Sequence, residues 1–275
     1  MTTLGLFPLT DPAASALDAL NGAIRAWTPT HVFALFSGGH DSLCASHIAS
    51  RGVQFDGCAH INPGIGIPET REFVMETCRT LGWPIREYRP PVSYEDIVLE
   101  HGFPGPAGHS VMYARLKERC LRVLVRQFKR HRRDRIMLVT GVRREESIRR
   151  MGHVEPVRRE GAKLWVAPII DWASCDKNRY IAATGLRRNE VVDLLCMSGE
   201  CLCGAFARPG EILEVERWYP SVAARIHALE VRCRERGVHA VWGTRPPPTP
   251  PPNRPSPARH VSLLVMRREA RAGGA

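Results

Sequence analysis

The chain has 275 residues, 44% of them hydrophobic, and a formal net charge of +11 from 39 lysines and arginines against 28 acidic residues. This composition is typical of a globular protein, and no stretch approaches the ~20 apolar residues that a membrane span needs. The N-terminal segment has no basic start followed by an apolar core, so we expect no signal peptide and a cytoplasmic protein without membrane attachment. In that compartment, its nine cysteines are expected to be thiols or metal ligands rather than disulfides. The excess of arginine favours a phosphate-bearing partner, either a nucleotide or a nucleic acid. For the densest run, 126–135, a solvated helix face is the alternative.

The chain divides by composition into three parts. Residues 1–30 form a lead-in with a helix predicted over 13–27, and residues 31–243 hold the periodic elements of the main domain. Residues 244–275 begin with a proline-rich run, RPPPTPPPNRPSP. Proline removes backbone donors, so this tail is expected to be extended and exposed.

Within the main domain, short apolar runs alternate with stretches of helical spacing. Strands are predicted at residues 31–36, 55–61, 84–88, 135–142 and 164–169. Helices are predicted at residues 41–50, 68–82 and 109–130. The alternation indicates an α/β fold, in which a mostly parallel, twisted sheet is covered by helices on both faces and followed by a helical and proline-rich extension. Ligands of such folds bind beyond the carboxyl ends of the strands, which directs attention to the loops that follow strands.

The loop after the first predicted strand reads Ser37-Gly38-Gly39-His40-Asp41-Ser42. Gly38 and Gly39 let the backbone approach a ligand closely. A helix that begins near Asp41 points free N–H groups and the positive end of its dipole at the same place, and the two serines add hydroxyl donors. The loop lacks the lysine of the common GxxxxGK(S/T) motif. It therefore predicts a phosphate site of another kind, with the loop's histidine as a further candidate contact; the alternative is a tight turn capped by Asp41.

Two other strand-following loops suit an anionic ligand. After the fourth predicted strand, Gly141 precedes Arg143 and Arg144. Their forked guanidinium groups suit bidentate binding of phosphate or sulfate, and Glu145 is placed to orient one of them by an ion pair. A surface arginine run is the alternative. After the second strand, the stretch NPGIGIPET contains two glycines, of which Gly64 is a candidate for close approach to the ligand.

Cysteines gather in the segment 196–204, CMSGECLCG. Cys196, Cys201 and Cys203 are close enough in sequence to act together, and all-thiolate ligation favours zinc or an iron–sulfur cluster. Cys120 and Cys175 lie upstream and are candidates for a fourth ligand. Cys120 also lies on the apolar stripe of its predicted helix, and Cys196 ends an apolar run, so for both a place in the core is the alternative.

Three of these segments, in this order, resemble the motifs of the phosphoadenosine phosphosulfate (PAPS) reductase-like family of PP-loop adenine nucleotide alpha hydrolases. The loop SGGHDS is similar to the family's SGGxDS loop. INPGIGIPETREF (61–73) resembles its segment ending in PET, and TGVRREES (140–147) resembles its TGxRRxxS segment. The resemblance covers roughly residues 30–210 and implies the adenine nucleotide alpha hydrolase fold.

The resemblance also implies roles for these residues. Residues of the SGGHDS loop would hold the phosphates of ATP or PAPS with Mg²⁺, and Asp41, Arg143 and Arg144 would serve catalysis. Some relatives hold a four-iron (4Fe-4S) cluster. That similarity implies a cluster on Cys120, Cys196, Cys201 and Cys203, with Cys175 in reserve.

One departure from the family shapes the expected activity. Assimilatory sulfonucleotide reductases carry a nucleophilic cysteine in a C-terminal ECGxH segment, and this chain has no cysteine after Cys233. The resemblance to iron–sulfur sulfurtransferases then implies ATP-dependent adenylylation and sulfur transfer to an acceptor in DNA or tRNA, with a protein as sulfur donor. The alternatives are a sulfonucleotide reductase that uses a partner's thiol, and a non-catalytic nucleotide- or iron–sulfur-binding regulatory protein.

Overall fold

The computed structural model describes residues 11–147 and 155–243. Their centre is a six-stranded sheet of order β3-β2-β1-β4-β6-β5. All neighbouring strands are parallel except β5, which runs antiparallel to β6 at one edge. The strands are β1 (His31–Leu35), β2 (Gly57–Ile61), β3 (Ile85–Tyr88), β4 (Ile136–Val139), β5 (Val157–Glu160) and β6 (Lys163–Val166). The predicted mostly parallel α/β sheet is confirmed.

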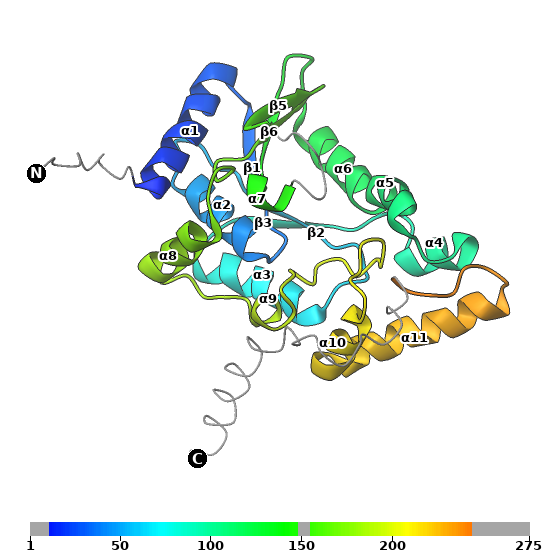
Figure 1. Cartoon of the computed structure of the whole chain (residues 1–275). Helices are drawn as coiled ribbons and strands as arrows, with labels where there is room; N and C mark the ends of the chain where they lie inside the picture. Colours follow the sequence, from blue (N-terminus) through cyan, green and yellow to red (C-terminus); the bar gives the residue numbers. More distant parts are fainter. Residues whose placement is uncertain (1–10, 148–154, 244–275) are drawn as a thin grey trace, which may run out of the picture.

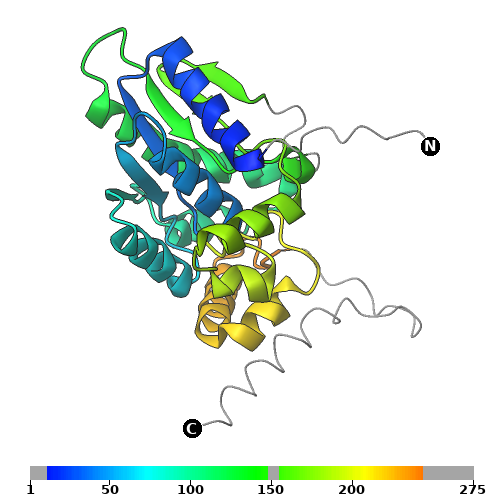
Figure 2. The same ribbon diagram turned by 90° about the vertical axis from the view of Figure 1, so that its left-hand side faces the viewer.

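Helices cover both faces of this sheet (Figure 1, Figure 2). The helices are α1 (Pro12–Trp27), α2 (His40–Ser50), α3 (Pro68–Thr80), α4 (Tyr94–His101), the short η1 (Pro106–Gly108), α5 (His109–Tyr113), the π-helical η2 (Ala114–Glu118), α6 (Arg119–Phe128), α7 (Arg144–Ser147), α8 (Ser174–Thr184), α9 (Glu190–Leu195), α10 (Glu211–Trp218) and α11 (Pro220–Glu235). One face carries α1, α2, α3 and α8, and the other carries α6.

The central strands read as apolar runs because they are buried on both sides. In β1, Val32 and Ala34 belong to the core under α1 and α2, whereas Phe33 belongs to the core under α6. Successive side chains of a strand point to opposite faces, so a strand with two covered faces needs apolar residues at every position. The five predicted strands are present, each one to four residues shorter than expected.

A third apolar cluster lies at one end of the sheet (Figure 1). It joins α4, α9, α10 and α11 with the cysteine segment, through buried residues such as Tyr94, Leu202 and Ile226. The sequence predicted a helical extension here without its individual helices. This layer packs against the cysteine segment through Met197, Cys201, Leu202 and Cys203.

Some sequence expectations differ from the structure or fall outside it. The helix predicted at 109–130 is a continuous run of α5, η2 and α6. Helix α1 packs into the main core through Leu20, which has no exposed surface, so the division of the chain at residue 30 stays a prediction. The proline-rich tail lies outside the described residues. Over 11–147 and 155–243, no helix combines the length and apolar character needed to cross a bilayer.

Candidate functional site

The loop between β1 and α2 forms an open backbone cradle. Gly39 is the residue before the first turn of α2, and no side chain caps the N–H groups that begin that helix. Gly38 has φ of +83°, and a Cβ built there would lie 2.7 Å from Thr70 Cγ2. Both its backbone conformation and its space therefore require glycine. The uncapped helix start at the end of a parallel strand is a place where an anion is stabilised.

The two serines of the loop stabilise its conformation through hydrogen bonds within the loop. The Ser42 hydroxyl donates to the Gly39 carbonyl at 2.8 Å and accepts from the Ser37 hydroxyl at 3.0 Å. The Ser37 backbone N–H also points to the Ser42 hydroxyl, at 3.3 Å. These bonds fix the shape of the loop. The two hydroxyls that were predicted to donate to phosphate therefore form hydrogen bonds within the loop in this structure.

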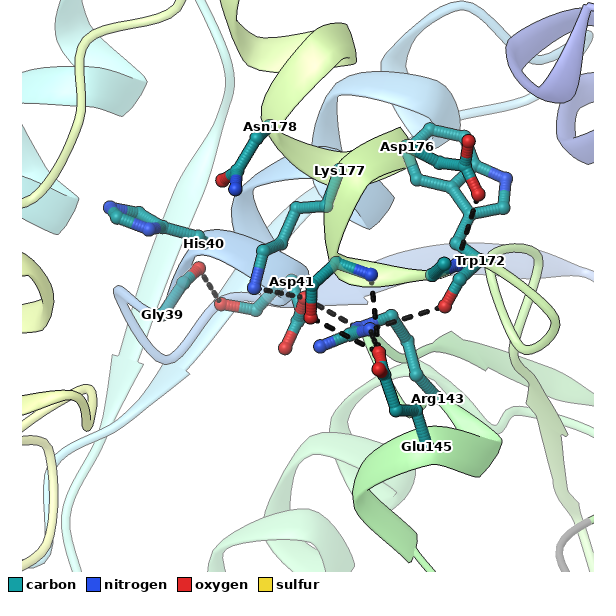
Figure 3. A network of polar contacts seen from close by, with 12 residues as sticks. Gly39, His40, Asp41, Arg143, Glu145, Trp172, Asp176, Lys177 and Asn178 are labelled. Atoms are coloured by element: carbon teal, nitrogen blue, oxygen red, sulfur yellow. Dashed lines mark hydrogen bonds and ion pairs between the residues drawn. The ribbon is translucent and has the colours of Figure 1, made fainter.

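Asp41 lies between two cations that come from different parts of the chain (Figure 3). Arg143 Nε donates to Asp41 Oδ1 at 2.8 Å, and Lys177 Nζ of α8 lies 3.3 Å from the same oxygen. Among the described residues, no hydrogen bond reaches the other carboxylate oxygen, Oδ2. The carboxylate therefore holds two positive charges beside the uncapped start of α2.

Arg143 is buried, with 2% of its surface exposed. Besides Asp41, its Nη1 donates to Glu145 Oε2 at 2.6 Å and to the Trp172 carbonyl at 3.1 Å (Figure 3). The hydrogen bond from Arg143 lowers the pKa of Glu145, and Glu145 also accepts from Ser174 at the start of α8. The expected ion pair between Glu145 and an arginine of this loop is present.

The loop after β4 fits closely over the start of α2. A Cβ on Gly141 would lie 2.5 Å from both Asp41 C and Ser42 N. Strands β1 and β4 are neighbours, and the chain proceeds from β1 to β2 on one side while β4 lies on the other. Such a switch point is where α/β sheets bind ligands. The structure thus brings the SGGHDS loop, Gly141 and Arg143 together, as the sequence predicted.

Two candidate residues lie apart from this network. The described partner of Arg144 Nε is Asp171, at 2.7 Å, and both side chains are about half or more exposed. Gly64 adopts φ of +81° with open space around it, and its carbonyl accepts from Arg225 of α11. The glycine under close packing in that loop is Gly66, whose Cβ would lie 2.4 Å from the Glu200 carbonyl.

His40 faces α9 rather than Asp41. The Asn189 backbone N–H donates to His40 Nε2 at 3.2 Å, so this nitrogen is an acceptor. Asn189 Nδ2 donates to the Gly38 carbonyl at 2.9 Å, while its Oδ1 caps α9 by accepting from the Val191 N–H. Burial, followed by the nearby Arg188, lowers the pKa of His40 from 6.5 to about 4. The histidine and Asn189 together fasten the loop to α9.

This environment predicts a pH-dependent stability. The unfolded chain takes up a proton on His40 near pH 6.5, but the folded chain does so only near pH 4. Stability is therefore undiminished above pH 6.5 and falls as the pH drops from 6.5 to 4, by about 3 kcal/mol. We expect His40→Gln to lose this dependence. Urea unfolding of both proteins at several pH values measures the difference, and parallel curves would contradict the assignment.

The four cysteines predicted as cluster ligands do not converge. Cys120 is buried in the core between α6 and the sheet, where its Sγ donates to the Leu116 carbonyl at 3.3 Å. Cys196 is exposed at the end of α9 with φ of 56°, and Cys175 is exposed on α8. Over residues 11–147 and 155–243, no group of three or more His, Cys, Asp and Glu side chains is arranged to hold a metal ion. A cluster on this set of four does not fit the described structure.

Cys201 and Cys203 lie two residues apart on the segment that packs against the third apolar cluster. The neighbouring Cys201, the Ala205 N–H and Lys117 lower the pKa of Cys203 to about 6. The neighbouring Cys203, together with burial, raises the pKa of Cys201 well above its usual value. The pair differs from an ordinary buried thiol, because burial alone raises a thiol's pKa.

The cysteine segment runs directly beside the cradle. The Ile67 N–H donates to the Gly199 carbonyl at 2.8 Å, and the Leu202 N–H donates to the Ile65 carbonyl at 2.9 Å. Thr70 Oγ1 donates to the Ser198 carbonyl at 2.6 Å. Ser198 Cβ would lie 3.4 Å from a Cβ on Gly39. The segment therefore begins at the glycine loop and leads from there to the thiol pair.

Sequence reasoning missed two residues of this site. Lys177 and Asn189 reach the loop from helices more than 130 residues downstream of it. No local motif marks either residue. The N-cap position of Asn189 was detectable from sequence, but its bond to the Gly38 carbonyl was not.

A glycine loop at the switch point of a parallel sheet, facing a buried arginine, defines a phosphate-loop α/β protein. The sequence profile of the phosphoadenosine phosphosulfate reductase domain matches residues 31–202. The chain belongs to this family, which confirms the resemblance seen in its motifs. No curated protein matches the chain by sequence.

Solved structures with a similar fold include a PAPS reductase from Candida auris in complex with phosphate. It has 16% sequence identity and a TM-score of 0.51, covering 70% of this chain and 94% of that one. Candida glabrata FMN adenylyltransferase with FAD and pyrophosphate has 11% identity and a TM-score of 0.48 over 70% and 65% of the two chains. Yeast FAD synthetase with FAD has 11% identity and a TM-score of 0.46 over 89% and 88%.

Proposed function

We propose that this chain is an enzyme that binds ATP with magnesium at the SGGHDS loop, adenylylates an acceptor and thereby prepares it for sulfur transfer. The observation that carries the proposal is the uncapped start of α2 beside Asp41 with its two cations. The family supports an adenine nucleotide as the ligand. The Candida auris PAPS reductase, which shares the fold, was solved as a phosphate complex.

The residues of the proposed nucleotide site have different roles in binding. The first N–H groups of α2 and the glycine backbone face the phosphates. Lys177, only 14% exposed and 3.3 Å from Asp41, is close enough to move onto a phosphate oxygen when a nucleotide arrives. Arg143, fixed by Glu145 and the Trp172 carbonyl, keeps Asp41 oriented. These cations stabilise the negative charge that develops when pyrophosphate leaves.

Asp41 is a suitable ligand for a magnesium ion whose other ligands are mainly phosphate oxygens. Mg²⁺ takes oxygen ligands and is commonly bound by one or two carboxylates together with the phosphates of its nucleotide. Both cations contact Asp41 Oδ1, which leaves Oδ2 as the oxygen that would hold the ion. When bound, the ion neutralises phosphate charge as a Lewis acid.

We propose the chemical class of the acceptor from the net charge of the chain. A formal net charge of +11 attracts a polyanion, and DNA or tRNA is the class we propose. Sulfur would come from a protein donor. No step is assigned to an iron–sulfur cluster, because among the described residues Cys120 and Cys196 do not join Cys201 and Cys203 in a metal-binding group.

The thiol pair favours a second candidate function. A sulfonucleotide reductase needs a thiol near the nucleotide, and Cys201 and Cys203 lie on the segment that runs beside the cradle. In that case PAPS, and not ATP, is the substrate.

Calorimetric binding separates the two candidates. We expect ATP with magnesium to bind more tightly than PAPS, and Asp41→Asn to weaken ATP binding at least ten-fold, because it removes the charge that holds the ion. Asp18→Asn is the matched control, because it makes the same change at an exposed carboxylate of α1, away from the Asp41 network. A preference for PAPS would favour the reductase, and failure to bind either nucleotide would overturn the proposal.

A further inference from the structure

Three aromatic rings form a row beside the cysteine segment. Phe206 packs against His109 with 4.4 Å between the ring centroids, and the centroids of His109 and Tyr113 are 6.3 Å apart. We propose that this aromatic row and the exposed cations of α6 bind a single-stranded nucleic acid, whose bases stack on the rings while its phosphates contact the cations. The inference rests on the proposed function, because it gives the nucleic-acid acceptor a surface and a single-stranded form.

The rings at the two ends of the row are open to solvent. Phe206 is 47% exposed and Tyr113 is 39% exposed. The other large hydrophobic side chains that are exposed in the described part of the chain are all aliphatic. Because every base has a π-face, an exposed ring offers a stacking site that an aliphatic side chain does not. The exposed aromatic surface of the described chain is thus concentrated in this row.

The backbone holds Phe206 at the surface. Its neighbours Ala205 and Ala207 are both buried, so the ring projects between two anchored residues. The turn before it requires glycine, because Gly204 has φ of +82° and a Cβ there would lie 3.0 Å from Trp242 Nε1. An exposed ring on a fixed backbone is preorganised for a ligand, because little conformational freedom is lost on binding.

The aromatic row is connected to the nucleotide cradle through the cysteine segment. Lys117, four residues after Tyr113, forms an ion pair with Glu200 of that segment. The segment begins beside Gly39, and Phe206 follows its other end. Figure 1 shows this part of the chain beside α5. A nucleic acid on the row would therefore lie next to the segment that runs beside the cradle.

The same helical run carries positive charge beyond the row. Helices α5, η2 and α6 are continuous from residue 109 to 128, a length of about 30 Å at 1.5 Å per residue. Arg122 is paired with Glu118. The other exposed cations of α6 and the turn after it form no ion pair with a carboxylate of the described residues: Arg119, Arg126, Lys129, Arg130, Arg132 and Arg133. A surface whose positive charges are not neutralised attracts a polyanion.

The combination of rings and cations favours a single strand over a duplex. Cations alone suit either form, because both present phosphates. Bases inside a duplex already stack on one another, whereas the bases of a single strand are free to stack on aromatic side chains. The aromatic row therefore gives the surface its preference for a single strand.

The first test compares three fluorescein-labelled probes of one sequence on the full chain, by fluorescence anisotropy. The probes are a single strand of DNA about twelve nucleotides long, which is within the usual range of single-strand sites, the same strand as RNA, and the DNA duplex. No ATP is present, so the result does not depend on the cradle. We expect at least one single strand to bind ten-fold or more tightly than the duplex. The tighter of the two strands then identifies the acceptor as DNA or RNA, and equal or tighter binding of the duplex would overturn the proposal.

Substitutions at Phe206 test the stacking. We expect Phe206→Ala to weaken binding of the single strand about ten-fold, a typical loss for one base stacked on an aromatic ring. Phe206→Leu should weaken it similarly, because leucine is apolar but has no π-face, whereas Phe206→Trp should preserve it. Leu213→Ala, which truncates an exposed apolar residue of α10, is the matched control and should leave binding unchanged.

A double variant tests the cations. Arg119 and Arg126 are seven residues apart, about two turns, and so lie on one side of α6. Arg119→Gln with Arg126→Gln should reduce the slope of log affinity against log salt by about 1.4, since each phosphate contact of a single strand contributes ~0.7. Arg25→Gln, at an exposed arginine of α1, is the control and should keep the slope.

Calorimetry of ATP with magnesium on the same proteins separates this inference from the proposed function. We expect Phe206→Ala to bind ATP as the unchanged chain does. If Phe206→Ala binds the single strand normally, the inference is overturned even where ATP binds. If the unchanged chain fails to bind ATP but binds the strand through Phe206, only the proposed function is overturned.

Discussion

Arg143→Ala is expected to lower the free energy of unfolding by about 3–5 kcal/mol, the usual cost of breaking a buried ion pair from one side. Arg143 is 2% exposed and bonds to two carboxylates and to the Trp172 carbonyl. Its removal leaves that carbonyl without its partner and Asp41 with Lys177 alone. We also expect nucleotide binding to be lost. Urea unfolding and calorimetry measure the two effects.

The neighbouring arginine gives the matched control. Arg144 pairs with Asp171 at the surface, and such pairs contribute about 0–1 kcal/mol. Arg144→Ala should therefore leave stability nearly unchanged. Its effect on nucleotide binding tests the sequence-based prediction that this residue contacts phosphate. Equal losses of stability in the two variants would contradict the prediction that Arg143 stabilises the fold more than Arg144 does.

Gly141→Ala is expected to disrupt the site without touching any side chain. The added Cβ would lie 2.5 Å from Asp41 C and Ser42 N, and backbone atoms cannot rotate away as a side chain can. Overpacking of this kind costs about 1–3 kcal/mol or more. Because the start of α2 must shift, we expect nucleotide affinity to fall at least ten-fold.

Gly105→Ala is the control for that variant. Nothing lies within 4 Å of a Cβ at Gly105, and its φ is −90°. Alanine is therefore tolerated there, and both stability and affinity should match those of the unchanged chain. If Gly141→Ala bound nucleotide normally, the close fit between the β4 loop and α2 would not matter for the site.

The parts of this protein that sequence predicts well are those whose physical cause is local. Strand β1 is apolar at successive positions because both faces are covered, and the glycines that follow it stand out after such a run. Strand β5 was missed because its VRRE sequence is exposed and charged, so it has no apolar pattern. Helix α4 was missed although a local signal exists, since Ser93 caps it by accepting from the Asp96 N–H.

The site was predictable only in part, for the same reason. The glycine loop and Arg143 each follow a predicted strand, and parallel strands bring such loops together. Lys177 and Asn189 reach the loop through packing of α8 and α9, which no spacing in the sequence encodes. Likewise, two glycines in NPGIGI look alike in sequence, and only the packed structure shows that Gly66, and not Gly64, lies against residue 200.

The bond from Asn189 to the Gly38 carbonyl joins residues 151 positions apart. During synthesis at about 5–20 residues per second, roughly 8–30 s pass between the two. Over that interval, the growing chain has its glycine loop but lacks the residue that fastens it, and Lys177 arrives only slightly earlier. The nascent chain therefore has an incomplete nucleotide site. Nucleotide binding can stabilise the fold only after most of the polypeptide has left the ribosome.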